Sequence, residues 1–311
     1  MILILIIKQK KIIISQINYT NKILNKFINN NINTNNNVNN NNKYNIIINN
    51  KSYKPTNLPG KPGVKYYKNI TQASNTDIKN YQKQIGSLLY LALKTRPDIT
   101  FAVINCARFM ANPDSHHFDA LADIWCYLIN HHNIGISYNC NGDNLYIKGY
   151  CDADWGNDLN NRRSTTGYLF SLSNDLGITN PISWNSQLQT TVTLSTCESE
   201  YMALKEATKE AIYLNNMLNY FNNILKLGYT TNSIPIILVD NESAKKLAEN
   251  PEFHKRSKHI DIIYHYTRDA IQNNRIKIIP IPSKDNIADI ITKNTNNNIF
   301  KLLCTKIICY I

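Results

Sequence analysis

A run of six apolar residues, from Ile234 to Val239, ends directly in an acidic residue, Asp240. A strand that is apolar at every position is buried on both faces, so it lies in a sheet with helices packed on each side. The short length of the run favours a strand over a helix. An acid placed directly after such a strand marks the carboxyl edge of the sheet. This segment therefore predicts an α/β domain and supplies a first candidate for a functional residue.

The segments on either side of this strand complete the predicted sheet. Residues alternate along the first of three predicted strands before it, and helical apolar spacing recurs in the later part of the domain. We predict strands over Leu145–Asp152, Thr166–Leu172, Pro181–Trp184 and Arg275–Ile281, and helices over Ser195–Phe221, Asn241–Glu249, Ser257–Asn273 and Lys284–Lys293. Three antiparallel strands followed by strands linked through helices form a mixed five-stranded sheet flanked by helices.

The rest of the chain is predicted to be simpler. Residues 1–57 are rich in Asn and Ile, with an almost pure Asn run from Asn29 to Asn42, and this composition predicts disorder. A linker over residues 58–80 follows, then a helical block over residues 81–140. The α/β domain occupies residues 145–295, and residues 296–311 form a tail.

Composition excludes several classes of protein. The net charge of +12 suggests nucleic acid, but residues 1–57 contain eight Lys and no acid, which leaves only +4 for the rest. The seven Cys and seven His show neither a CxxC pair nor zinc-site spacing, which predicts a reducing, intracellular compartment, cytoplasmic or nuclear. The apolar Met1–Ile7 precedes its lysines and is too short for a secretory signal or a membrane span, so we expect neither secretion nor a membrane partner.

Four acidic residues lie where the predicted fold can use them for metal chemistry. Asp152 ends the first strand, Glu200 lies one turn into the long helix, Asp240 ends the buried strand and Asp289 lies in the last helix. Two divalent ions about 3.5–4 Å apart require several carboxylates from separate elements. Hard oxygen ligands suit magnesium. These acids are far apart in the sequence, so they form a site only if the fold gathers them.

Two of these acids have close competitors. Asp154 lies two residues after Asp152 and points to the same face if the strand continues, so it is an alternative first ligand. Glu198 competes with Glu200, but the two lie about 200° apart around a helix and cannot both face the metals. Glu198 fits a capping box in which its carboxylate returns to the Ser195 amide, so Glu200 is favoured as the ligand.

The other two acids have structural alternatives. Asp240 could cap the helix predicted to follow it, although its place after an apolar strand favours a catalytic role. Asp289 could be a surface acid that pairs with Lys293 one turn later.

Several motifs occur in an order that resembles the ribonuclease H region of copia-type retrotransposon Pol polyproteins. The segments that carry the resemblance are Gly86–Leu91, Arg96–Ile99, Tyr150–Trp155, Arg162–Tyr168, Ile182–Trp184, Leu194–Ala203, Val239–Ala244, Lys258–Ile262 and Asn286–Lys293. Each motif is weak alone, but their common order over roughly residues 81–295 is specific. The first two segments resemble the connection between polymerase and ribonuclease H.

The resemblance implies an RNase H-like fold and a two-metal ribonuclease. Asp152, Glu200, Asp240 and Asp289 would hold two Mg²⁺ or Mn²⁺ ions, and the substrate would be the RNA strand of an RNA–DNA hybrid. The polymerase portion of a related polyprotein would be a partner, since no Tyr-x-Asp-Asp pair occurs upstream of Tyr81. The alternative is a folded but inactive remnant that at most binds nucleic acid. An integrase or transposase is disfavoured because those enzymes use acids in the order D, D, E.

A basic stretch lies before the helix that follows Asp240. Lys255, Arg256 and Lys258 are candidates for contact with nucleic-acid phosphates, although a solvated charge run explains them equally well. The nearby His254, His259 and His265 are disfavoured as metal ligands. No His lies between His265 and Asp289, where many cellular ribonucleases H place a mobile histidine.

Overall fold

The computed structural model of this chain describes two compact units. The described residues are 4–8, 11–28, 46–48, 51–139, 145–174, 176–177, 179–226, 234–242 and 258–311. Unit 1 comprises Met1–Ile7, Ile12–Ser137 and Lys293–Ile311, and unit 2 comprises Lys8–Lys11 and Tyr138–Thr292.

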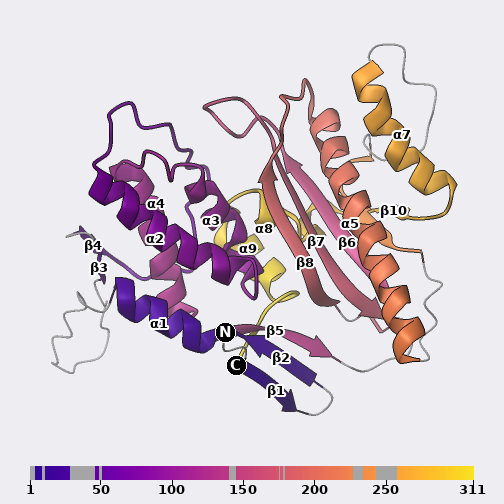
Figure 1. Cartoon of the computed structure of the whole chain (residues 1–311), viewed down its shortest axis with the longest axis horizontal. Helices are drawn as coiled ribbons and strands as arrows, with labels where there is room; N and C mark the ends of the chain where they lie inside the picture. Colours follow the sequence, from indigo (N-terminus) through magenta and orange to yellow (C-terminus); the bar gives the residue numbers. More distant parts are fainter. Residues whose placement is uncertain are drawn as a thin grey trace. The chain divides into compact units, whose positions relative to one another are not determined.

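Unit 2 is built on the mixed five-stranded sheet that the sequence predicts. Its strands are β6 (Leu145–Asp154), β7 (Thr165–Asn174), β8 (Thr179–Leu188), β9 (Ile236–Val239) and β10 (Lys277–Pro280), in the order β10-β9-β6-β7-β8 (Figure 1). Strands β6, β7 and β8 are antiparallel neighbours, whereas β9 runs parallel to both β6 and β10. The wholly apolar strand β9 is thus the second strand from one edge, and Ile237, Leu238 and Val239 are buried.

Helices cover both faces of this sheet. The long α5 (Thr196–Leu225) buries Tyr201, Leu204 and Ala207 in a core shared with Ile147 and Phe170 of the strands, and α7 (Lys258–Gln272) packs on α5. The short α8 (Asp289–Thr292) lies on the opposite face, against β6, β7 and β8 (Figure 1). This arrangement is an RNase H-like α/β fold, as expected.

The last predicted helix differs from what the structure shows. Instead of one helix over Lys284–Lys293, a 3-10 turn, η4 (Ser283–Asp285), is followed by α8, and Asn286 between them is extended. The physical reason is the Asn286 side chain, whose Oδ1 accepts the Ala288 N–H at 3.1 Å and so replaces helical backbone bonding at that point. The predicted helix Asn241–Glu249 falls mostly on residues 243–257, outside the described part of the chain.

Unit 1 contains the expected helical block. Its helices are α2 (Asn75–Ala92), α3 (Thr100–Ala107) and α4 (Ser115–Asn130), with a 3-10 turn, η2 (Pro97–Ile99), between the first two. At that turn the buried Arg96 pairs with the buried Asp98 at 2.7 Å, and Tyr127 donates a hydrogen bond to the same carboxylate oxygen at 2.8 Å. The Arg-Pro-Asp motif of the sequence therefore has a structural role here.

The N-terminal segment is more ordered than its composition predicts. The structure describes β1 (Ile4–Lys8), β2 (Lys11–Ser15), α1 (Ile17–Phe27), β3 (Ile46–Ile48) and β4 (Lys51–Tyr53) within residues 1–57. In α1 and just after it, Thr20, Ile23, Leu24 and Ile28 are buried at helical spacing. The prediction of disorder was wrong for these residues because the high Asn content masked an amphipathic pattern. Residues 29–45, which include the Asn run, lie outside the described residues.

The C-terminal segment also belongs to a folded unit rather than to a tail. Residues 296–311 contain α9 (Asn297–Cys304) and β11 (Cys309–Tyr310). Phe300, Leu303 and Ile307 are buried. Strand β11 pairs antiparallel with β5 (Ile134–Asn139) in a sheet of order β1-β2-β5-β11. Across the part of the chain that the structure describes, no helix is long and apolar enough to cross a membrane.

Candidate metal centre

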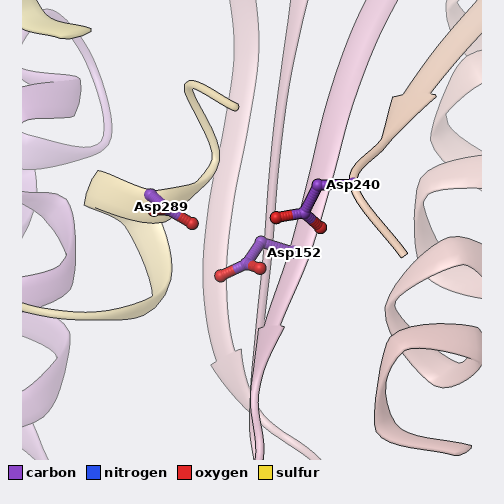
Figure 2. Close-up of side chains that lie close together, drawn as sticks. All are labelled: Asp152, Asp240 and Asp289. Atoms are coloured by element: carbon purple, nitrogen blue, oxygen red, sulfur yellow. The ribbon is translucent and has the colours of Figure 1, made fainter. Parts of the chain in front are cut away.

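Three of the four predicted ligands converge in unit 2. Asp152, Asp240 and Asp289 each present a carboxylate oxygen such that the three atoms lie within 4.8 Å of one another (Figure 2). They come from the end part of β6, the residue after β9 and the first residue of α8. Asp152 is 2% exposed and Asp289 is 9% exposed, while Asp240 is half-buried.

The register of the parallel strands explains why Asp152 and Asp240 meet. Tyr150 of β6 is paired with Leu238 of β9, and each acid follows its paired residue by two positions. Parallel neighbours that end at the same edge therefore place both carboxylates side by side. The sequence predicted this edge from the apolar run that precedes Asp240, and the structure shows the two acids there.

Asp289 is brought to the cluster by side chains that tie α8 to β6. The fully buried Asn286 donates from Nδ2 to the Cys151 carbonyl at 3.0 Å, while its Oδ1 accepts the Ala288 N–H. Thr292, at the other end of α8, donates a hydrogen bond from its hydroxyl to Oδ2 of Asp152. These contacts join positions far apart in the chain, and they were not anticipated from the sequence.

Gly167 allows α8 to approach the sheet this closely. It is the residue of β7 directly opposite Asp152. A Cβ atom at Gly167 would lie only 2.5 Å from Cγ2 of Thr292 and 3.1 Å from Cγ2 of Ile291. The absence of a side chain here is therefore a packing requirement of the site. Gly167 belongs to one of the motifs that carry the family resemblance, which is the signal that could have identified it.

Glu200, the fourth predicted ligand, is not one of the three converging residues. It is half-buried in the second turn of α5. Burial raises the pKa of the Cys151 thiol well above its usual value, and the charges of Glu200, Asp152 and Asp240 raise it further. All three carboxylates thus act on one buried atom of β6. This common effect associates Glu200 with the edge of the sheet where the other acids meet.

The start of α5 is held in place by Gln189, which sequence reasoning also missed. Its Nε2 donates to the hydroxyl of Thr166 on β7 and to the backbone carbonyl of Ser199, each at 2.9 Å. Because Ser199 directly precedes Glu200, this buried amide links the position of that acid to the sheet. No local pattern distinguishes Gln189 from other polar residues that follow a strand.

Glu198 and Asp154, the alternatives to Glu200 and Asp152, lie outside the three-residue cluster. Glu198 accepts the Leu194 N–H at 2.7 Å, and its own N–H donates to Ser195 Oγ at 3.1 Å. The expected capping role is therefore present, but the amide that Glu198 binds is that of Leu194 and not that of Ser195. Asp154 is half-buried at the end of β6 and is not a member of the three-residue cluster found among the described residues.

The predicted basic contacts stay untested. Lys255 and Arg256 lie outside the described residues, and Lys258 is the first residue of α7, with a side chain that is not described. Their role in binding phosphates remains a prediction from the sequence.

The three converging carboxylates favour a bound cation. Two negative charges 4.8 Å apart repel by about 3 kcal/mol at an effective dielectric constant of about 20. Three such charges, two of them buried, are expensive to keep together unless protons or cations compensate them. Carboxylate oxygens are hard ligands that suit Mg²⁺ and Mn²⁺. The donor set therefore fits the predicted metals.

Comparison with known proteins identifies the family of the chain. No protein-family model matches it. The retrovirus-related Pol polyprotein from transposon TNT 1-94 of Nicotiana tabacum is 36% identical over 262 residues, which are 82% of this chain and 18% of that protein. The corresponding polyprotein from transposon RE1 of Arabidopsis thaliana is 36% identical over 232 residues, 75% of this chain and 15% of that protein. The chain belongs to the family of copia-type Pol polyproteins.

These two matches cover most of this chain but only a small part of each relative. The chain spans less than a fifth of the two plant polyproteins. A shorter match, to the secreted RxLR effector protein 161 of Plasmopara viticola, is 41% identical over 134 residues, 43% of this chain and 90% of that protein.

Solved structures with a similar course of the chain are ribonucleases H and reverse transcriptases. RNase H1 from Halobacterium salinarum is 14% identical and aligns with 47% of this chain and 93% of its own, with a TM-score of 0.29. The foamy viral protease-reverse transcriptase in complex with RNA/DNA hybrid is 15% identical and aligns with 69% of this chain and 26% of its own, with a TM-score of 0.40. The assignment of the fold rests on the strand order and the helices of unit 2 itself.

Proposed function

We propose that unit 2 is a ribonuclease H that hydrolyses the RNA strand of RNA–DNA hybrids with two Mg²⁺ or Mn²⁺ ions. The observation that supports this proposal best is the meeting of Asp152, Asp240 and Asp289 at one edge of the sheet. Glu200 is proposed as the fourth ligand because it lies in the motif Leu194–Ala203 that carries the family resemblance, and its charge, like those of Asp152 and Asp240, raises the pKa of the Cys151 thiol. Membership of the copia-type Pol family supports the substrate class.

The chain contributes positioning and charge to this reaction. When bound, two divalent ions supply an activated water and stabilise the charge that develops on the leaving 3′ oxygen. The pairing of β6 with β9 holds the backbones of Asp152 and Asp240 close together, each two residues after a paired position. Asp289 is held by the Asn286 contact to β6. A rigid set of ligands keeps the reacting phosphate in line and limits the reorganisation needed during the reaction.

The proposed substrate contacts extend beyond the carboxylates. Lys255, Arg256 and Lys258 are proposed to neutralise phosphates of the hybrid, which would position the duplex without selecting its sequence. The 2′-hydroxyls of the RNA strand distinguish a hybrid from duplex DNA. The polymerase portion of a related polyprotein is proposed as the partner that supplies such a hybrid.

The decisive experiment is cleavage of a labelled RNA–DNA hybrid by the purified full chain. We expect cleavage of the RNA strand in Mg²⁺ or Mn²⁺, none with a chelator, and none of duplex DNA with the same base sequence. Asp289→Asn should abolish cleavage and retain the fold. If the chain neither cleaves the hybrid nor gains thermal stability from either ion, the proposal fails and the chain is an inactive folded remnant.

A further inference from the structure

Thr292 makes an unusual use of its hydroxyl. It is fully buried at the last position of α8, and its Oγ1 donates to Oδ2 of Asp152 on β6. Two carbonyls of its own helix segment are also near, Ala288 O at 3.3 Å and Asp289 O at 3.2 Å. Threonines in helices commonly donate to such a carbonyl three or four residues earlier. Here the carboxylate of another element is the closest acceptor.

A hydroxyl carries one hydrogen, so it can serve one of these three acceptors well at any time. A hydrogen bond to an ionised carboxylate is roughly twice as strong as one to a neutral carbonyl. The geometry and the charge therefore both direct the Thr292 proton to Asp152. As a result, one oxygen of this proposed ligand is held by a neighbouring helix.

The other branch of Thr292 has a separate task. Its methyl carbon, Cγ2, lies over Gly167, at a place where a Cβ atom would be only 2.5 Å away. The methyl group therefore packs on bare backbone of β7 while the hydroxyl reaches β6. Packing and hydrogen bonding can be removed independently, because valine keeps the methyl group and serine keeps the hydroxyl.

We propose that Thr292 is a positioning residue for metal binding. By holding Oδ2, its hydroxyl fixes the rotation of the Asp152 carboxylate, which together with Asp240 and Asp289 would hold the cation. This inference rests on the proposed function. Groups that orient the first ligands of a metal typically change its affinity by about 10- to 100-fold when they are removed.

The position of α8 does not depend on the Thr292 hydroxyl alone. Asn286 joins the segment before α8 to the Cys151 carbonyl of β6 at 3.0 Å. Ile290 and Ile291 of α8 are buried as well. Loss of one hydroxyl should therefore leave Asp289 in place and release only the orientation of Asp152.

The test compares Thr292→Val with Thr292→Ser in the full chain, with Mg²⁺ titrated by calorimetry and by thermal denaturation. Thr208→Val is a matched control, because Thr208 is equally buried in unit 2 and donates to Leu204 O of its own helix at 2.8 Å. Melting temperatures in a chelator report any purely structural effect of each change.

We expect Thr292→Val to raise the half-saturating Mg²⁺ concentration by about 10- to 100-fold, and Thr292→Ser to stay close to the original protein. Thr208→Val should lower the melting temperature without changing Mg²⁺ affinity. Unchanged affinity in Thr292→Val, with the original protein binding Mg²⁺, would overturn the role of Thr292 alone. If the original protein binds neither Mg²⁺ nor Mn²⁺, the proposed function fails and this inference fails with it.

Discussion

Replacing Asp240 by Asn separates metal binding from folding. Asparagine keeps the size and much of the hydrogen bonding of aspartate but removes its charge. Asp240 has two charged neighbours within 4.8 Å, and each pair at this distance repels by about 0.9 kcal/mol even at the dielectric constant of water. Because Asp240 is half-buried, this value is a conservative lower limit for two ionised partners.

The change should therefore stabilise the metal-free protein. Removing two repulsions of this size gives about 2 kcal/mol, which corresponds to a rise of roughly 4–8 °C in the melting temperature of a unit of this size. Hybrid cleavage should be lost at the same time. Mg²⁺ should stabilise the original protein more than the variant, since a ligand that binds only the folded state adds stability by mass action.

Thermal denaturation in a chelator and in Mg²⁺, together with hybrid cleavage, measures all three effects. Glu242→Gln is the matched control, because it removes one negative charge at an exposed position two residues away. The control should change neither cleavage nor the response to Mg²⁺. A lower melting temperature of Asp240→Asn in the chelator, or an equal response of both proteins to Mg²⁺, would refute the repulsion argument.

Four further substitutions test neighbouring parts of the site. Glu198→Ala should lower the free energy of unfolding by about 1 kcal/mol and leave cleavage intact, because it removes only a contact that caps the start of α5. Glu200→Gln should instead abolish cleavage with little change in melting temperature. The opposite pattern would exchange their roles. Gly167→Ala should destabilise the protein by about 1–3 kcal/mol and weaken Mg²⁺ binding, since its Cβ would collide with Thr292; calorimetry of the variant checks both. Burial raises the pKa of the Cys151 thiol in the folded protein, whereas the unfolded chain loses this proton above about pH 8.5. The free energy of unfolding therefore has its full value below that pH and decreases as the pH rises further. Urea denaturation between pH 8 and 10 should show a smaller loss of stability for Cys151→Ala, and equal slopes would contradict the shift.

The strands of unit 2 could be predicted from the sequence because each has a local pattern. Strand β9 is apolar throughout and three of its four residues are buried, as expected for a strand between two others when helices cover both faces. The antiparallel β6, β7 and β8 lie within a few residues of their predicted bounds. The buried residues of α1 also follow helical spacing, but the many Asn residues around them led to a prediction of disorder.

The acids of the site were predictable as candidates for a related reason. Asp152 lies near the end of β6 and Asp240 directly follows β9, and both strands have clear patterns, so the place of the two acids at a sheet edge could be inferred. Helix geometry and the capping pattern distinguish the role of Glu198 from that of Glu200. The contact of Glu198 with the Leu194 amide shows that it caps the start of the helix, although through a different amide from the predicted one. The identity of the amide could not be inferred because it depends on how the chain enters the helix.

By itself, the sequence determined the chemistry that is available and the edge of the sheet where two of the acids lie. Only the tertiary structure decided how Asp289 reaches them, through Asn286 and Thr292. Those two side chains contact β6 across separations of 135 and 140 residues. Periodicity and capping patterns report on neighbours within one element, whereas contacts at such separations depend on how the whole unit packs, with Gly167 leaving the space that α8 occupies.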